Sequence, residues 1–211
     1  TSANSYMIEF NDFVAVFEAP GDEARSLAVI EEVVKLAPNK PIRWLITTHP
    51  HFDHIGGLRT YLHIGSTIVT HISNLEFLNS DVLSYEPRTV EPDIVSKWPP
   101  TELAEGYNYE AIQERYVIPD NSRLLHVYYV QPLQHVTGML MAYLPNEGIA
   151  FQADLFDTHE APRASQLPAM RSLHTQVERM DLDVQTLAPV HGQPVPWTEF
   201  LTAFNELNAE N

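Results

Sequence analysis

The stretch of sequence that decides the fold spans residues 47–57 and is Thr47-Thr48-His49-Pro50-His51-Phe52-Asp53-His54-Ile55-Gly56-Gly57. It follows directly on the apolar run of residues 42–46, which we interpret as a buried strand. A chain that leaves such a strand is extended, so His49 and His51 point to the same side because side chains alternate along extended backbone. Asp53 and His54 then begin the turn into the two glycines, from which their side chains can face the same space.

Imidazole nitrogens and carboxylate oxygens are the ligands that zinc, iron and manganese accept. A single histidine in a polar loop is more often solvated than bound to metal. A His-x-His-x-Asp-His pattern at the end of a predicted strand has few other uses. The sequence therefore predicts a metal site that includes His49, His51, Asp53 and His54.

Composition and charge limit the number of domains and the kinds of partner that we expect for the protein. The chain has 211 residues, of which 44% are hydrophobic and 19% charged, as expected for one globular domain over residues 1–211. It has no apolar run near the ~20 residues of a membrane helix. A net charge of −16 without a basic tract would repel a phosphate backbone. We therefore expect a soluble protein that acts on a small-molecule substrate and binds neither nucleic acid nor membrane.

The chain has no cysteine, which excludes disulfides and thiolate metal ligands. No signal peptide is visible in it, so the sequence leaves open whether the protein is cytoplasmic, periplasmic or secreted.

Apolar periodicity and turn residues predict an alternation of strands and helices, which indicates an α/β fold. Strands are expected at residues 6–10, 13–17, 42–47, 67–70, 109–118, 123–131, 139–144, 149–153 and 184–187. Helices are expected at residues 22–37, 57–63, 74–78, 170–180 and 197–207. Residues 80–108 are rich in proline and acidic side chains, and two interpretations stay open: a surface excursion that covers the site, or an irregular loop without a role.

Three further residues have the context of metal ligands. His135 follows a predicted strand and precedes Gly138, Asp154 follows the predicted strand 149–153, and His191 precedes Gly192. All three stand where predicted strands stop. The histidines that lack this context are expected to be ordinary surface or core residues: His63, His71, His126, His159 and His174.

With these residues the chain resembles the metallo-β-lactamase fold superfamily of metallohydrolases. The resemblance rests on four motifs in the family's order: His49-Pro50-His51-Phe52-Asp53-His54 with Gly56-Gly57, His135-x-x-Gly138, Ala153-Asp154, and Val190-His191-Gly192. It covers the chain from Tyr6 onward and implies a four-layer αββα sandwich, with the metal site at one edge where loops of two sheets meet.

The resemblance also implies a ligand set for two metals. One metal would be held by His49, His51 and His135, the other by Asp53, His54 and His191, with Asp154 bridging. His51 stands where the diiron flavoprotein branch has glutamate. Asp154 stands where one group of true β-lactamases has cysteine and another has no bridging ligand, which argues against antibiotic hydrolysis as the main activity. The set is similar to that of glyoxalase II, lactonases and related esterases.

Two phrases, Glu18-Ala19-Pro20 and the segment from Pro189 to Trp197, resemble a subgroup of long bacterial members. Family members usually begin with one or two further strands before the hairpin expected at residues 6–17. The resemblance thus suggests that this chain is the C-terminal part of a longer one, and it leaves both a homo-oligomer and a missing N-terminal segment open.

The resemblance implies a metal-dependent hydrolase that uses a metal-bound hydroxide on an ester, thioester, lactone or amide bond. Two zinc ions per chain are expected, with iron or manganese as alternatives, and Asp53 would be catalytic by orienting the nucleophile and moving its proton. Two alternatives stay open. One is an oxidoreductase like the mononuclear iron persulfide dioxygenases, with His49, His135 and Asp154 as ligands; the other is a non-catalytic, metal-stabilised module of a larger protein. The sequence does not identify the substrate.

Overall fold

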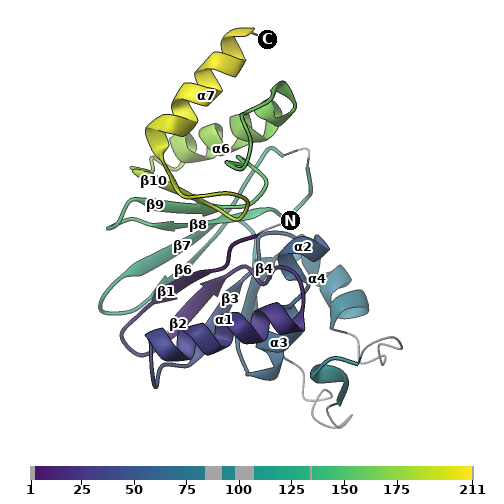
Figure 1. Ribbon diagram of the computed structural model, residues 1–211. Coiled ribbons are helices and arrows are strands. Elements are labelled where there is room, and N and C mark those ends of the chain that lie inside the picture. The colour runs from purple at the N-terminus through teal and green to yellow at the C-terminus, as the bar shows by residue number, and fades with distance from the viewer. Residues whose placement is uncertain (1–2, 84–91, 98–106, 134, 211) are drawn as a thin grey trace. The chain divides into compact units, whose positions relative to one another are not determined.

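The computed structural model describes residues 3–83, 92–97, 107–133 and 135–210 (Figure 1). The chain divides into two compact units. We call residues 5–112 the N-terminal unit, and residues 1–4 together with 113–211 the C-terminal unit. Most of the proline-rich segment 80–108 lies outside the described residues, so its predicted role in covering the site is not addressed by the structure.

The N-terminal unit is built on a five-stranded sheet in the order β1-β2-β3-β4-β5. Its strands are β1 (Tyr6–Glu9), β2 (Val14–Phe17), β3 (Ile42–Ile46), β4 (Thr67–His71) and β5 (Tyr109–Ile112). β1 and β2 form the predicted antiparallel hairpin, and the remaining neighbours are parallel. All four residues of β2 are buried, whereas β3 has Arg43 exposed and Trp44 half-buried.

Two helices pack against one face of this sheet, α1 (Glu23–Leu36) and α3 (Leu58–His63) (Figure 1). α1 begins where predicted, because the Asp22 carboxylate accepts a hydrogen bond from the Arg25 N–H at 2.9 Å. Its buried face is narrow: Val33 is 2% exposed, whereas Leu27 and Val34 face outward. Short helical segments complete the unit: α2 (Phe52–Ile55), η1 (Ile72–Asn74), α4 (Leu75–Phe77), η2 (Leu78–Val82) and η3 (Val95–Lys97).

The C-terminal unit is built on a six-stranded sheet in the order β11-β10-β9-β8-β7-β6. Its strands are β6 (Arg115–Pro119), β7 (Leu124–Tyr129), β8 (Leu140–Leu144), β9 (Ile149–Gln152), β10 (Thr186–Pro189) and β11 (Val195–Pro196). Only β9 and β10 are parallel, and α6 (Leu167–Arg179) is the crossover between them. α6 and α7 (Trp197–Glu210) bury their apolar faces on this sheet, and η4 (Ala164–Gln166) leads into α6 (Figure 1).

The predicted α/β class is confirmed, and two predicted strands need correction. The strand expected at residues 109–118 is wrong as one element: it is split into β5 and β6, which belong to different sheets. The bend falls at Gln113-Glu114, where one unit ends and the other begins. The strand expected at residues 184–187 is shifted to Thr186–Pro189. That the whole chain forms one domain stays a prediction.

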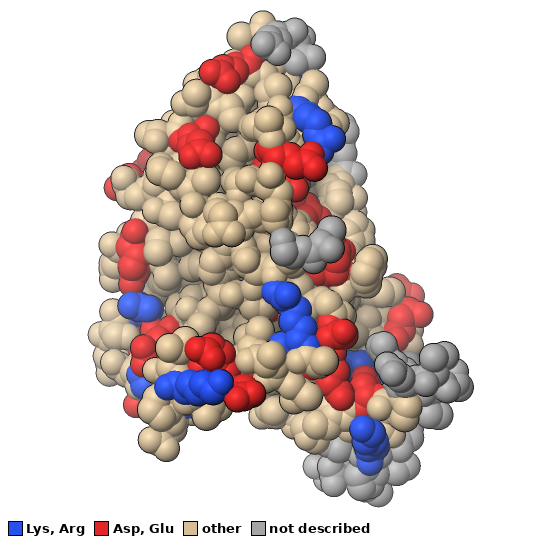
Figure 2. All heavy atoms as spheres, viewed as in Figure 1, with Lys and Arg blue, Asp and Glu red and all other residues tan. Residues whose placement is uncertain are grey.

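Acidic side chains are spread over the face seen in Figure 2, and the lysines and arginines on that face stand apart from one another. Among the described residues, no helix is long and apolar enough to span a bilayer.

Candidate metal centre

The first pair of candidate ligands lies directly after β3. His49 is 1% exposed, and its Nε2 atom lies 2.9 Å from Nδ1 of the more exposed His51. The Nδ1 atom of His49 is hydrogen-bonded to the Thr48 hydroxyl at 3.0 Å. This bond fixes the ring so that its other nitrogen faces His51, as a second partner does for a metal-binding histidine. The two nitrogens therefore converge as two ligands of one metal ion would.

A buried carboxylate orients the next ligand. Nδ1 of His54 lies 2.5 Å from Oε2 of Glu18, and neither side chain is exposed to solvent. The other oxygen of Glu18 accepts a hydrogen bond from the Thr48 N–H at 2.6 Å. His54 thus turns its Nε2 atom toward Asp53, whose Oδ2 atom lies 3.7 Å away. The carboxylate–histidine pair is the arrangement that holds a ligating imidazole in one orientation.

The two glycines after the motif allow the backbone segments to approach closely. A Cβ atom on Gly56 would lie 1.8 Å from the Gly21 carbonyl oxygen, and one on Gly57 would lie 1.9 Å from the Ser26 hydroxyl oxygen. The Gly57 N–H donates to the Ala19 carbonyl at 2.9 Å. Glycine at these positions therefore brings the motif against the segment that contains Glu18.

In the C-terminal unit, a single carboxylate faces two histidines. Oδ2 of Asp154 lies 3.0 Å from Nε2 of His135, and Oδ1 of Asp154 lies 3.2 Å from Nε2 of His191. Each oxygen therefore has its own imidazole partner. This arrangement is compatible with a carboxylate that contacts two metal ions, one through each oxygen.

The backbone around Asp154 is held by a buried glutamine. Asp154 has φ of +58°, a conformation that few residues other than glycine, asparagine and aspartate adopt. The side-chain oxygen of Gln152 accepts hydrogen bonds from the N–H groups of Leu155 and Phe156, and its amide nitrogen donates to the Phe156 carbonyl. Gln152 thus stabilises the turn that projects Asp154 from the end of β9.

His191 is positioned by contacts from residues distant in sequence. The Asn4 side chain donates to the carbonyls of Pro189 and Gly192, at 3.0 and 2.6 Å, and the Thr158 N–H donates to the His191 carbonyl at 3.3 Å. Gly192 has φ of +106°. The backbone therefore reverses directly after His191, whose side chain is turned toward Asp154.

The predicted ligands that belong to the same unit are thus brought together within that unit. His49, His51, Asp53 and His54 converge in the N-terminal unit, and His135, Asp154 and His191 converge in the C-terminal unit. A joint site of all seven residues stays a prediction. Sequence analysis did not identify Glu18, Gln152 or Asn4. Only Glu18 had a local signal, an acidic residue directly after the apolar run that forms β2.

Among the described residues, the remaining histidines belong to no group of candidate ligands. Four of them have other partners: His71 with Ser73, His126 with Tyr128, His159 with Asp157, and His174 with Glu178. Burial, together with Arg115, lowers the pKa of His126.

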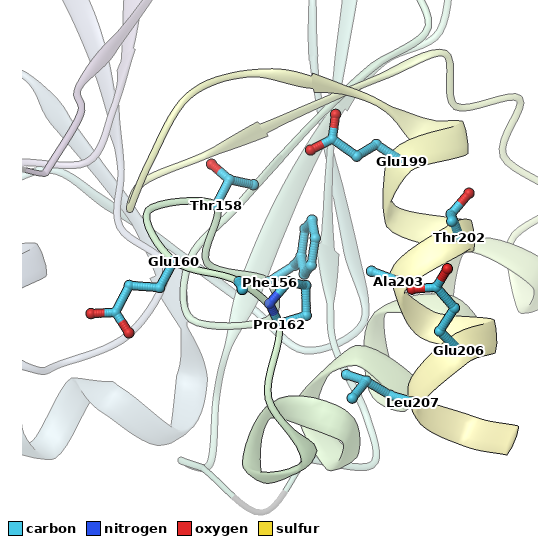
Figure 3. Close-up of a pocket in the computed structure, with 10 residues that line it drawn as sticks. Phe156, Thr158, Glu160, Pro162, Glu199, Thr202, Ala203, Glu206 and Leu207 are labelled. Atoms are coloured by element: carbon cyan, nitrogen blue, oxygen red, sulfur yellow. The ribbon is translucent and has the colours of Figure 1, made fainter. Parts of the chain in front are cut away.

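Each unit has a pocket beside its predicted ligands. One of about 500 Å³ includes His51 and Asp53 in its lining, and one of about 310 Å³ includes His135 and Asp154. A third, of about 540 Å³, lies between α7 and the loop that follows Asp154 (Figure 3). Its walls include Phe156 and Leu207 and contain no predicted ligand. The first two pockets therefore adjoin the candidate ligands, and the third does not include any of them.

Several solved structures share this fold. A metallo-beta-lactamase from Pontibacter korlensis matches with a TM-score of 0.70 at 14% identity, covering 98% of this chain and 87% of that one. The DIM-1 metallo-beta-lactamase matches with a TM-score of 0.70 at 13% identity, covering 99% and 88%. The mono-zinc form of FIM-1 from Pseudomonas aeruginosa matches with a TM-score of 0.65 at 19% identity, covering 99% and 84%. At these identities the likeness shows the fold, and it confirms the predicted metallo-β-lactamase fold.

No curated protein matches the chain. Its sequence matches the family described as the metallo-beta-lactamase superfamily over residues 1–191, which is most of its length. This match supports a metal-dependent hydrolase at the level of the family. The chain belongs to the metallo-beta-lactamase superfamily.

Proposed function

We propose that the protein is a dinuclear zinc hydrolase that cleaves an ester, thioester, lactone or amide bond. The observation that supports this most directly is the Asp154 carboxylate, whose two oxygens face different histidines at 3.0 and 3.2 Å. A carboxylate that served a single metal would not need an imidazole beside each oxygen. Asp154 is therefore suited to bridging two ions.

The proposed ligands combine residues from both units. His49, His51 and His135 would hold one metal, and Asp53, His54 and His191 the other. The donor set of imidazole nitrogens and carboxylate oxygens suits zinc, and iron or manganese could also be accepted because such sites follow metal availability. Glu18 and Thr48, through their hydrogen bonds to His54 and His49, would keep the ligating nitrogens oriented.

When bound, the metal would supply a nucleophile at neutral pH, because it lowers the pKa of water from 15.7 to about 7. Asp53 is suited to the proton chemistry, since its side chain is one-third exposed and lies beside His54. Its carboxylate oxygen would orient the attacking water and accept its proton, then deliver that proton to the leaving group. The bond from the carbonyl carbon to oxygen, sulfur or nitrogen breaks, the acid product gains the water oxygen, and the leaving group departs protonated.

The first test is the metal content per chain of protein purified without added metal or chelator. About two zinc ions per chain would support the proposal. About one iron would contradict it and favour the persulfide dioxygenase alternative, which oxygen consumption with a thiol persulfide would then check. A chain that stays metal-free when zinc is offered would also contradict it, and would favour a non-catalytic module.

The second test is substitution of the motif. Asp53→Ala and His51→Ala should abolish turnover of the esters, thioesters and lactones that the unsubstituted protein hydrolyses, with the circular dichroism spectrum preserved. Asp12→Ala, which changes an exposed aspartate in the β1–β2 turn, is the matched control and should leave turnover intact. Full activity in either motif variant would exclude the mechanism.

A further inference from the structure

The pocket of about 500 Å³ beside the metal motif combines two candidate ligands with apolar walls. His51 and Asp53 belong to its lining. Ile55 and Val82 also line it and are buried, with 5% and 8% exposure, whereas Phe52 and Phe77 are exposed at 81% and 41%. A pocket of this size that is mostly apolar, with a few polar groups, has the composition of a small-molecule site.

The exposure of Phe52 follows from the geometry of α2. In this single helical turn, His54 and Ile55 are buried, so Phe52 projects to the opposite side. The ring contributes little to the core, because most of its surface stays in contact with water. It is therefore available to cover an apolar ligand, and Phe77 is a second exposed ring in the same lining.

The charges of the pocket disfavour an anion. Arg59 is the cation among the described lining residues, and its guanidinium donates to both oxygens of Asp93 and to the Val82 carbonyl. The carboxylates of Asp53 and Asp81 also belong to the lining. Because Asp53 is a proposed metal ligand, Asp81 is the acidic group among the described lining residues that a phosphate or carboxylate would meet. The arginine is already engaged, so a neutral occupant fits better.

We propose that this pocket binds the apolar acyl chain of a neutral ester or lactone whose carbonyl is presented to His51 and Asp53. The inference rests on the proposed hydrolase function and narrows it to one substrate class. Phe52 and Phe77 are then the residues that determine chain-length preference. The pocket of Figure 3 differs, since its lining includes Glu160, Glu199 and Glu206 and contains no candidate ligand.

The first experiment measures kcat/KM of the zinc-loaded full chain for p-nitrophenyl acetate, butanoate, hexanoate and octanoate. Each methylene buried in the pocket should raise kcat/KM by about fourfold until the pocket is filled. In Phe77→Ser and Phe52→Ser, the octanoate-to-acetate ratio should fall by about tenfold, equivalent to losing contact with roughly two methylenes. Phe77 is the more informative position, because it is remote in sequence from the ligands.

The matched control is Leu36→Ser, which removes a similarly exposed apolar side chain from the end of α1 in the same unit. It should leave the octanoate-to-acetate ratio unchanged. A ratio that falls equally in Leu36→Ser would overturn the assignment, and so would an unchanged ratio in both phenylalanine variants.

The second experiment measures binding without turnover. Methyl heptyl ketone, which is neutral and cannot be hydrolysed, is titrated into metal-free protein and followed by saturation-transfer NMR. It should bind more tightly than methyl ethyl ketone and more tightly than the octanoate anion, and its affinity should fall in Phe77→Ser but not in Leu36→Ser. Equal affinities for the ketone and for octanoate would overturn the proposal.

The two experiments separate this inference from the proposed function. If the metal-free protein binds the ketone in a way that depends on Phe77, and the zinc-loaded protein hydrolyses none of the esters, the results would support the pocket and contradict the hydrolase. Ester hydrolysis without chain-length dependence, together with no ketone binding, would support the hydrolase and overturn the pocket.

Discussion

Nδ1 of His54 lies 2.5 Å from Oε2 of Glu18, and the two residues are separated by 36 positions in the sequence. Both side chains are inaccessible to solvent, and the second oxygen of Glu18 accepts the Thr48 N–H. The carboxylate therefore connects the end of β2, the end of β3 and α2, which contains His54. Glu18 is thus a positioning residue for a predicted ligand.

Replacement of Glu18 should weaken metal binding. Glu18→Gln keeps the shape of the side chain but removes the charge that holds the His54 ring, so metal affinity should fall by about 10- to 100-fold. Competition with a chromogenic chelator measures this. The control is Glu9→Gln, which changes an exposed glutamate that pairs with Lys40 at the end of β1. Equal affinities in the two variants would show that Glu18 does not orient the ligand.

Asp154 should determine how many metals are bound. Asp154→Ala removes both oxygens from between His135 and His191, and the zinc content should fall from two ions per chain to one or none. Elemental analysis after zinc loading and desalting gives the result. Asp157→Ala is the control, because this aspartate lies in the same loop and pairs with His159 instead. Two tightly held zinc ions in Asp154→Ala would rule out a bridging role.

Gly192 should tolerate no side chain. Its φ is +106°, and a Cβ atom would lie 2.0 Å from the Thr158 hydroxyl oxygen and 2.9 Å from the His159 backbone nitrogen. Gly192→Ala should therefore destabilise the protein by roughly 2 to 5 kcal/mol, from backbone strain and overpacking together. Gly65 offers the comparison, since it has φ of +81° and a Cβ atom there would meet no other atom within 4 Å. Gly65→Ala should cost only the strain, roughly 1 to 2 kcal/mol. Denaturant unfolding compares the two, and equal losses would show that the Thr158 contact is unimportant.

Asp93 should make stability depend on acid pH. Burial raises the pKa of this carboxyl, but hydrogen bonds from Arg59 and Ser96 outweigh it and lower the pKa from 3.8 to about 2. Because the folded-state pKa is depressed, the stabilisation is complete above the unfolded-state pKa and is lost as the pH falls toward 2. The unsubstituted protein should lose about 1.5 kcal/mol more than Asp93→Asn between about pH 5 and about pH 2.5. Urea unfolding at about pH 5 and about pH 2.5 tests it, with exposed Asp12→Asn as the control. Parallel losses in Asp93→Asn and the unsubstituted protein would contradict the prediction.

Much of the fold was predictable because its signals are local. The apolar run before the motif predicted β3, and apolar periodicity predicted α1 and α3. The predicted strand at residues 109–118 failed because no glycine, proline, asparagine or aspartate marks the break after Ile112. Only tertiary pairing separates β5, which joins β4, from β6, which joins β7.

The sequence by itself determined the chemistry of the predicted site. Three histidines and an aspartate within six residues after a strand, followed by His135, Asp154 and His191 at later strand ends, define a donor set that suits a metal. These residues can be recognised because the sequence shows directly which residues are of metal-binding types and how closely they are spaced. The alternation of strands and helices can also be recognised from the sequence.

Only the tertiary structure decided how these side chains are oriented. Glu18 reaches His54 across 36 positions, and Asn4 reaches the Pro189 carbonyl across 185. Gln152 holds the strained turn at Asp154 through three hydrogen bonds to backbone. The contacts of Glu18 and Asn4 leave no periodic or motif signal, because they depend on where distant strands end in space and not on the residues next to them in the sequence.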